Sequence, residues 1–201
     1  IGMAMHESQS RLWENIIGRS DWFWKKYYPQ AKQAFQALQA ISRQDFVKAI
    51  NVIRPSLVRV EADEVTYGLH IIIRYEIEKD LIAGKFKVRD LPKIWNAKYK
   101  EYLGVSPKND AEGVLQDIHW SHGAFGYFPT YLLGTLISAQ LWNKMPKSTD
   151  LRVIRVWLRK NIHQHGRVYT TDELLKKITG ESLNPIYFLN YLEEKFGKMY
   201  K

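Results

Sequence analysis

One carboxylate near the start of the chain could do chemistry, in the stretch H-E-S-Q-S-R-L-W-E (residues 6–14). Glu7 and Glu14 are seven residues apart, so one face of a helix would carry both of them. Arg11 follows Glu7 at the spacing of a helical ion pair. A carboxylate fixed in this way can ligate a metal ion such as zinc. Spacing alone favours a simpler interpretation, an exposed glutamate near a helix N-terminus.

An arginine in S-L-V-R-V-E-A-D-E (residues 56–64) is a second candidate. Arg59 could clamp a carboxylate through the two parallel N–H bonds of its guanidinium fork. Three acids follow it closely and could hold its orientation: Glu61, Asp63 and Glu64. The alternative is a structural Arg–Asp pair, which the residue types alone favour slightly.

The stretch richest in reactive side chains is G-V-L-Q-D-I-H-W-S-H-G-A-F-G-Y-F-P-T-Y (residues 113–131). Asp117 and His119 could share a network of polar contacts. Tyr127 and Tyr131 are four residues apart and would point to one place on a continuous helix. Imidazole and phenol donors aimed together would stabilise an oxyanion. An aromatic core around a capped helix explains His119, Tyr127 and Tyr131 equally well.

The elements that must position these residues are almost all helical. The segment 56–60 is rich in β-formers, and we expect at most a short extended segment or small hairpin there. The fold class is therefore all-α, and residues 1–201 read as one multi-helix unit without repeats or a linker. Apolar periodicity and start signals predict helices at 3–18, 22–41, 42–51, 62–83, 91–103, 111–121, 129–145, 149–163, 171–178 and 184–199.

Composition restricts the class of protein. The net charge is +9, but no basic run accompanies a nucleic-acid-binding motif, so we predict no nucleic-acid partner. The absence of cysteine rules out disulfides and thiolate metal sites, and is in keeping with a cytoplasmic protein. The apolar tract 124–142 is interrupted by glycine and proline, which predicts a buried helix with its lead-in and no contact with a membrane.

Three stretches together resemble one family. H-E-S-Q (6–9), V-R-V-E-A-D (58–63) and G-V-L-Q-D-I-H-W (113–120) are similar to the motifs H-E-S-Q, I-R-x-x-A-D and G-x-x-Q-D-x-H-W of the thermostable metallocarboxypeptidases, the carboxypeptidase Taq type. The order is the same, and only Val58 departs from its motif, standing where isoleucine is usual. Each motif alone is weak evidence, whereas three in order are specific.

The resemblance implies a largely helical zinc exopeptidase, usually a homodimer, that removes residues from the C-termini of peptides. It makes Glu7 the third zinc ligand, beside the two histidines of an H-E-x-x-H motif whose glutamate is the general base. It makes Arg59 the candidate that binds the substrate carboxylate. It places His119, Tyr127 and Tyr131 where related enzymes hold transition-state donors.

One part of the family pattern is not in these residues. None of the six histidines begins H-E-x-x-H, and the motif D-x-R-x-T is absent too. We therefore expect residues 1–201 to be the C-terminal part of a single helical catalytic domain, inactive without the N-terminal segment of the same enzyme. Zinc or cobalt would bind only with ligands from that segment. The alternative is a non-catalytic helical interaction module derived from the same fold.

Overall fold

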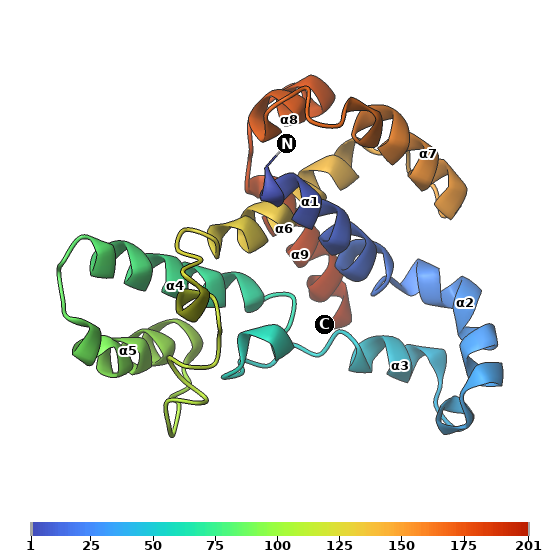
Figure 1. Ribbon diagram of the computed structural model, residues 1–201. Helices are drawn as coiled ribbons and strands as arrows, with labels where there is room; N and C mark the ends of the chain where they lie inside the picture. The colour runs from blue at the N-terminus through green and yellow to red at the C-terminus, as the bar shows by residue number, and fades with distance from the viewer. Residues whose placement is uncertain (1, 201) are drawn as a thin grey trace. The chain divides into compact units, whose positions relative to one another are not determined.

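Helices make up most of the part of the chain described by this computed structural model, residues 2–200 (Figure 1). No β-strand occurs within this range, which confirms the all-α prediction. Five 3-10 turns and one π-helical stretch, η1, Leu12–Ile17, complete the helical structure of these residues. The α-helices are α1, Met3–Arg11; α2, Asp21–Ala34; α3, Arg43–Ala49; α4, Tyr67–Ile82; α5, Leu91–Leu103; α6, Pro129–Lys144; α7, Leu151–Asn161; α8, Thr171–Thr179; and α9, Ile186–Met199.

Several helix starts follow from local chemistry, as the sequence predicts. The Ser42 hydroxyl accepts a hydrogen bond from the Asp45 backbone N–H at 3.0 Å, which caps α3. Thr170 and Glu173 form a reciprocal capping box at the start of α8. Pro129 occupies the first position of α6, where its missing N–H costs nothing. These signals act within a few residues and do not depend on the rest of the fold.

Three predicted helices differ clearly from the structure. The helix expected over 62–83 starts only at Tyr67. The helix expected over 22–41 ends at Ala34, with Pro29 inside it. The helix expected over 111–121 is wrong, because this stretch forms turns followed by a short 3-10 helix, η5, Trp120–His122. Its side chains bond to distant partners instead: the Gln116 amide, for example, donates to the Leu57 carbonyl at 2.8 Å. Tertiary contacts have overridden the local helical preference.

Segment 56–60 is not a strand. Val58 has an extended backbone, and the 3-10 turn η3, Arg59–Glu61, follows at once. This agrees with the prediction of no more than a short extended segment. It also places Arg59 in a tight turn ahead of α4.

Contacts between Cα atoms divide the chain into two compact units. Residues up to Asn51 and from Leu133 onward form the first, and Val52–Leu132 form the second, so the boundary falls inside α6. No proline-rich or glycine-rich linker marks this boundary in the sequence. The first unit contains Glu7, and the second contains Arg59, His119, Tyr127 and Tyr131.

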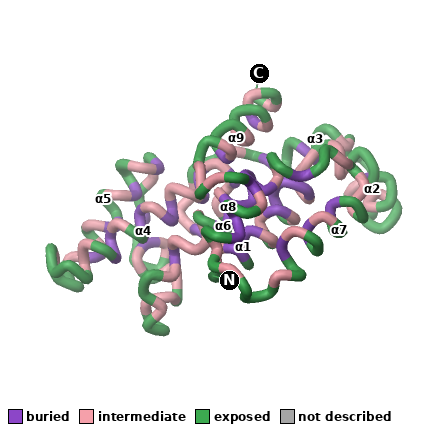
Figure 2. The backbone as a smooth tube through the Cα atoms, turned by 90° about the horizontal axis from the view of Figure 1, so that it is seen from above, coloured by how far each residue is buried: buried purple, intermediate pink, exposed green. Residues whose placement is uncertain are grey.

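The core of the first unit gathers apolar residues from helices far apart in sequence. Met5 and Leu12 from the N-terminal helix pack in one cluster with Ile137 and Leu141 of α6. Figure 2 shows buried positions along both α1 and α6. Residues from α7, α8 and α9 complete the cluster, namely Ile154, Leu158, Leu174, Leu175 and Phe188. The backbone of α1 is therefore held firmly against α6.

The second unit is built on α4 and α5, which lie side by side (Figure 1). Ile73 and Ile77 of α4 pack against Trp95 and Tyr99 of α5. The buried face of α4 is not wholly apolar, because three buried polar residues recur on it at intervals of four: His70, Arg74 and Glu78. Residues at this spacing lie above one another on a helix. This polar stripe is the base on which the candidate site is assembled.

None of the helices in residues 2–200 combines the length and the apolar composition needed to cross a membrane. The apolar tract 124–142 becomes the lead-in to α6 and most of that helix, as predicted.

Candidate active site

Arg74 is the most deeply buried charge of the second unit, with a side chain that is 0% exposed. Its Nε donates to Asp117 Oδ2 at 2.7 Å and its Nη2 donates to Gln116 Oε1 at 2.8 Å. Its Nη1 donates to the His70 carbonyl at 2.8 Å and to the Tyr99 hydroxyl at 3.1 Å. A buried guanidinium is tolerated only when paired in this way. Arg74 therefore fixes Gln116 and Asp117 against α4.

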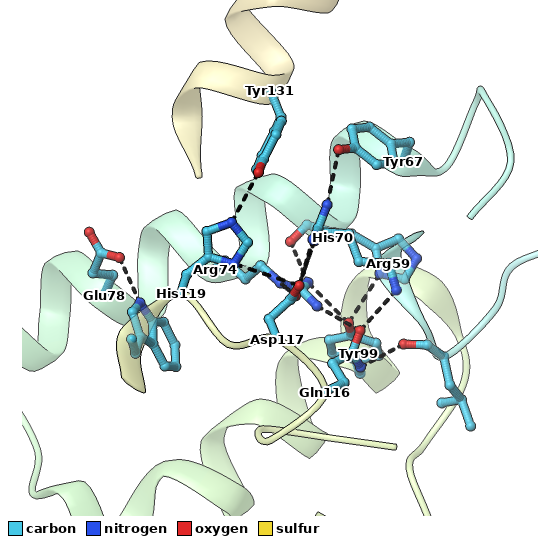
Figure 3. A network of polar contacts seen from close by, with 12 residues as sticks. Arg59, Tyr67, His70, Arg74, Glu78, Tyr99, Gln116, Asp117, His119 and Tyr131 are labelled. Atoms are coloured by element: carbon cyan, nitrogen blue, oxygen red, sulfur yellow. Dashed lines mark hydrogen bonds and ion pairs between the residues drawn. The ribbon is translucent and has the colours of Figure 1, made fainter. Parts of the chain in front are cut away.

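Asp117 joins two arginines, as Figure 3 shows. Besides Arg74, it accepts from Arg59 Nε at 3.0 Å and from Arg59 Nη2 at 2.5 Å. Burial by itself would raise the pKa of Asp117, but the hydrogen bond and charge of Arg59, together with Arg74, bring that pKa below its usual value. The carboxylate is therefore ionised at neutral pH. Two guanidiniums share this one carboxylate, so the trio carries a net positive charge.

Arg59, the predicted carboxylate clamp, has a side chain only 8% exposed. Its remaining terminal nitrogen, Nη1, donates to the Tyr67 hydroxyl at 3.2 Å. The acid that orients it is Asp117, whereas the neighbouring Asp63 instead accepts the backbone N–H groups of Val65 and Thr66. The structure thus supports an Arg–Asp pair, but with a partner 58 residues away. One N–H on each terminal nitrogen is left over from these bonds.

Gln116 uses both ends of its amide to hold the turn that carries Arg59. Its Oε1 accepts from the Arg59 backbone N–H at 2.8 Å, and its Nε2 donates to the Leu57 carbonyl at 2.8 Å. The same Nε2 also donates to the Glu112 carbonyl at 2.7 Å. Because these bonds span both sides of the turn, Gln116 sets the backbone position of Arg59 and links it to the guanidinium of Arg74.

His119 pairs with a tyrosine at the edge of this network. Its Nε2 lies 3.0 Å from the Tyr131 hydroxyl. Its Nδ1 is buried without a hydrogen bond among the described residues and lies 3.8 Å from Asp117 Oδ1. Burial lowers the pKa of His119, and the charges of Arg59 and Arg74 lower it further against the opposing effect of Asp117. The imidazole is therefore neutral at neutral pH.

Tyr127 and Tyr131 gather around the same imidazole. Their ring centroids are 5.5 Å apart, and the Tyr127 ring lies 5.7 Å from His119. Tyr127 precedes α6, and Tyr131 stands in its first turn, so the two are not on one continuous helix. They nevertheless meet at His119. The Tyr127 hydroxyl has no hydrogen-bond partner in the described part of the chain.

Glu78 anchors the loop that leads to these tyrosines. Its Oε2 accepts from the Trp120 indole N–H at 2.7 Å, and its Oε1 accepts from the backbone N–H of Gly126. Gly126 has a φ of 75°, a conformation that favours glycine. A buried carboxylate thus ties both ends of the turn between His119 and Tyr127 to α4.

Glu7 lies in the first unit and has a side chain 22% exposed. Its Oε1 accepts from Arg11 Nε at 2.9 Å, and its Oε2 lies 3.0 Å from the Ser10 hydroxyl, whose one proton it shares with the Glu7 carbonyl at 2.9 Å. The ion pair with Arg11 was predicted from its spacing. Within residues 2–200, no group of three or more His, Cys, Asp or Glu side chains could hold a metal ion. An oriented carboxylate of this kind fits one position of a zinc site and no more.

A family model for the carboxypeptidase Taq (M32) metallopeptidases matches residues 1–196. The chain belongs to this family. Carboxypeptidase 1 of Bacillus subtilis is 46% identical to it, and thermostable carboxypeptidase 1 of Thermus thermophilus is 43% identical. The solved M32 carboxypeptidase of Deinococcus radiodurans superimposes with a TM-score of 0.95 at 38% identity.

These M32 relatives are longer than the chain. The Bacillus alignment covers 98% of the chain and 42% of the relative, and the Thermus alignment covers 100% and 41%. The Deinococcus structure is matched over 100% of the chain and 43% of its own length. The chain therefore spans about two fifths of the length of the relatives it matches.

The structure brings four of the five predicted M32 site residues into one unit, and Glu7 lies in the other unit. Sequence reasoning did not predict roles for Arg74, Glu78 or Tyr67. The polar stripe at 70, 74 and 78 was a signal for two of them, since buried helix faces are rarely charged. Gln116 and Asp117 lie within the third motif, so the resemblance already pointed at them.

Proposed function

We propose that the chain forms part of a metallocarboxypeptidase that hydrolyses the last peptide bond of peptides with a free C-terminus. The observation that carries this proposal is the Arg59–Asp117–Arg74 network beside His119 and Tyr131, built from two of the three motifs shared with the M32 family. Activity would further require a segment carrying H-E-x-x-H, which the 201 residues do not contain. By resemblance, we propose a cytoplasmic homodimer for the complete enzyme.

Glu7 is our proposed third metal ligand, with zinc as the first choice and cobalt as the second. When bound, such a metal lowers the pKa of its water and polarises the scissile carbonyl. The contribution of this chain is to present one carboxylate in a fixed orientation. Ser10 and Arg11 hold its two oxygens separately, which limits rotation of the carboxylate.

Arg59 is our proposed binding group for the carboxylate of the substrate. Asp117 neutralises only one of the two guanidiniums that contact it, so a second carboxylate would be attracted to the pair. Asp117 and Tyr67 hold the Arg59 fork rigidly, which reduces the entropy lost on binding. The remaining N–H groups of Arg59 would donate to the substrate.

His119 and a tyrosine are our proposed oxyanion donors. If the neutral imidazole donates its Nε2–H to the Tyr131 oxygen, the Tyr131 hydroxyl keeps its own proton, which could be donated to an oxyanion. Tyr127, whose hydroxyl has no partner in the described residues, is a second donor at the same place. Both donors are held by packing around His119, as preorganised stabilisation of a developing charge requires.

The test is to measure metal content and peptidase activity of the chain alone and together with a segment bearing H-E-x-x-H. We expect about one zinc per chain and release of C-terminal residues only in the combined sample. Stoichiometric zinc on the chain alone would contradict the proposed ligand set. Zinc uptake without peptidase activity would favour the alternative, a non-catalytic helical interaction module.

A further inference from the structure

We propose that Gly134 is a positioning residue for the Glu7 carboxylate. A Cβ atom built on Gly134 would lie 2.6 Å from Glu7 Cγ and 2.7 Å from Glu7 Cβ. It would also approach the Ala4 carbonyl oxygen to 3.1 Å. Carbon atoms in van der Waals contact are about 3.5–4.0 Å apart, so any side chain at position 134 would displace the stem of Glu7. This inference rests on the proposed role of Glu7 as a metal ligand.

The backbone of α6 does not itself require glycine at position 134. Gly134 is in the interior of α6 and is not among the glycines with positive φ. Glycine in a helix interior costs about 1 kcal/mol relative to alanine. The local preference therefore favours alanine, and what favours glycine is the space taken by Glu7.

The helix that carries Glu7 cannot easily move away to make room. Met5 and Leu12, on either side of Glu7 in sequence, are buried in one cluster with Ile137 and Leu141 of α6. Figure 1 shows α1 passing across α6, and the close approach of Gly134 to Glu7 and Ala4 shows that the two helices are in contact. A larger residue at position 134 would therefore turn the Glu7 side chain aside and also strain the packing of α1, because Glu7 Cβ and the Ala4 carbonyl move only with the backbone.

Gly134 thus completes a set of contacts around Glu7. Ser10 and Arg11 hold the carboxylate oxygens, and the α6 backbone at Gly134 supports the aliphatic stem. A metal ligand must be held to within about 0.5 Å of its productive position. The overlap at Gly134 is larger than this tolerance, so we expect the carboxylate to leave the metal.

The experiment uses the combined protein, the chain together with its H-E-x-x-H segment, and measures Zn²⁺ affinity by competition with a chelator. Gly134→Ala should weaken zinc binding by about 10–100-fold, the range found when groups supporting a ligand are lost. The matched control is Gly197→Ala, because Gly197 is also inside a helix but a Cβ there would meet nothing within 4 Å. The control should bind zinc like the parent protein.

A third variant separates this inference from the proposed function. If Glu7→Gln leaves zinc affinity unchanged, Glu7 is not a ligand and the proposed function of this residue fails. If Glu7→Gln weakens binding but a folded Gly134→Ala does not, only the role of Gly134 fails. Adding Gly134→Ala to Glu7→Gln should cause little further loss, because the displaced group no longer serves as a ligand.

A glycine exchange covers the case in which Gly134→Ala does not fold. The double variant Glu7→Gly/Gly134→Ala removes both Glu7 atoms that the new methyl group would meet and keeps one glycine in the pair of helices. Circular dichroism should show that it folds with a melting temperature near that of Glu7→Gly. If the double variant also fails to fold, Gly134 is required for a reason other than Glu7, and the inference is overturned.

Discussion

The two units hold their candidate residues in opposite ways. Glu7 is partly open, and its hydrogen-bond partners Ser10 and Arg11 are within four residues of it in sequence. Arg59 is nearly closed off, and its ion-pair partner is 58 residues away. The first arrangement orients a carboxylate without satisfying all of its lone pairs. The second is a buried network in which two guanidiniums share one carboxylate.

Because of this difference, we expect substitutions at Glu7 to change mainly metal binding and substitutions in the arginine network to change mainly folding stability. Removing the Glu7 carboxylate leaves Arg11 partly exposed and still paired with Glu14, so it should affect the metal and little else. Removing a member of the Arg59–Asp117–Arg74 network leaves a charge unpaired in the interior, which is costly for folding. Four predictions test this contrast, starting with the largest expected effect.

Asp117→Asn should be the most damaging substitution, because it leaves two buried guanidiniums without an anion. Breaking a buried ion pair from one side costs about 3–5 kcal/mol of stability. Chemical denaturation would measure the loss. Asp80→Asn is the matched control, since Asp80 pairs with Lys85 on the surface and should leave the unfolding midpoint nearly unchanged. Equal effects of both substitutions would show that the buried network contributes no more to stability than a surface ion pair does.

A pH dependence of stability should arise from His70, which is fully buried beside Arg74. Burial, with the charges of Arg74 and Arg59, lowers the pKa of His70 from 6.5 to about 4. The unfolded chain therefore binds a proton more readily, so stability present above pH 6.5 is lost as the pH falls toward about 4. The loss would reach about 3 kcal/mol, because each tenfold difference in proton affinity is worth about 1.4 kcal/mol.

The measurement is the free energy of unfolding between pH 7 and pH 4, compared with His70→Asn. An asparagine amide does not titrate and can keep the hydrogen bond that His70 Nδ1 makes with the Tyr99 hydroxyl at 3.0 Å. The slope in this range should be smaller in the variant. An unchanged slope would show that other groups in the network control the acid response.

Much of the first unit could be predicted from sequence, and much of the second could not. The pair of Glu7 with Arg11 and the cap of α3 depend on residues three or four apart, so spacing alone predicts them. Local spacing could not predict the turns at 111–121, because Gln116 and Asp117 bond to residues about 40–60 positions away. The periodicity of apolar residues contains no information about such long-range contacts. The family motifs identified Arg59 and His119 as candidate site residues even though their contacts could not be predicted.

Arg59→Lys tests whether the guanidinium is needed for binding, because it keeps the positive charge beside Asp117 and removes the two parallel N–H donors. Hydrogen bonds to charged groups are worth about 1.5–3 kcal/mol, so kcat/KM of the combined enzyme on peptides with free C-termini should fall by roughly 10–100-fold. Peptides with an amidated C-terminus should be affected much less. A similar loss on both kinds of peptide would mean that Arg59 supports the fold and does not bind the substrate carboxylate.

The smallest effect should distinguish the two tyrosines. The Tyr131 hydroxyl is 3.0 Å from His119 Nε2, whereas the Tyr127 hydroxyl makes no hydrogen bond to a described residue, so Tyr131 is the better-oriented donor. In the combined enzyme, Tyr131→Phe should lower kcat by about 10-fold or more with little change in KM, because an oxyanion donor acts in the transition state. Tyr127→Phe should have the smaller effect and serves as the control, since it removes the same atom from a ring in the same cluster. The reverse order would make Tyr127 the donor and leave the His119–Tyr131 pair to hold the turn in place. Steady-state kinetics on one peptide, with the melting temperature of each variant, decides between these outcomes.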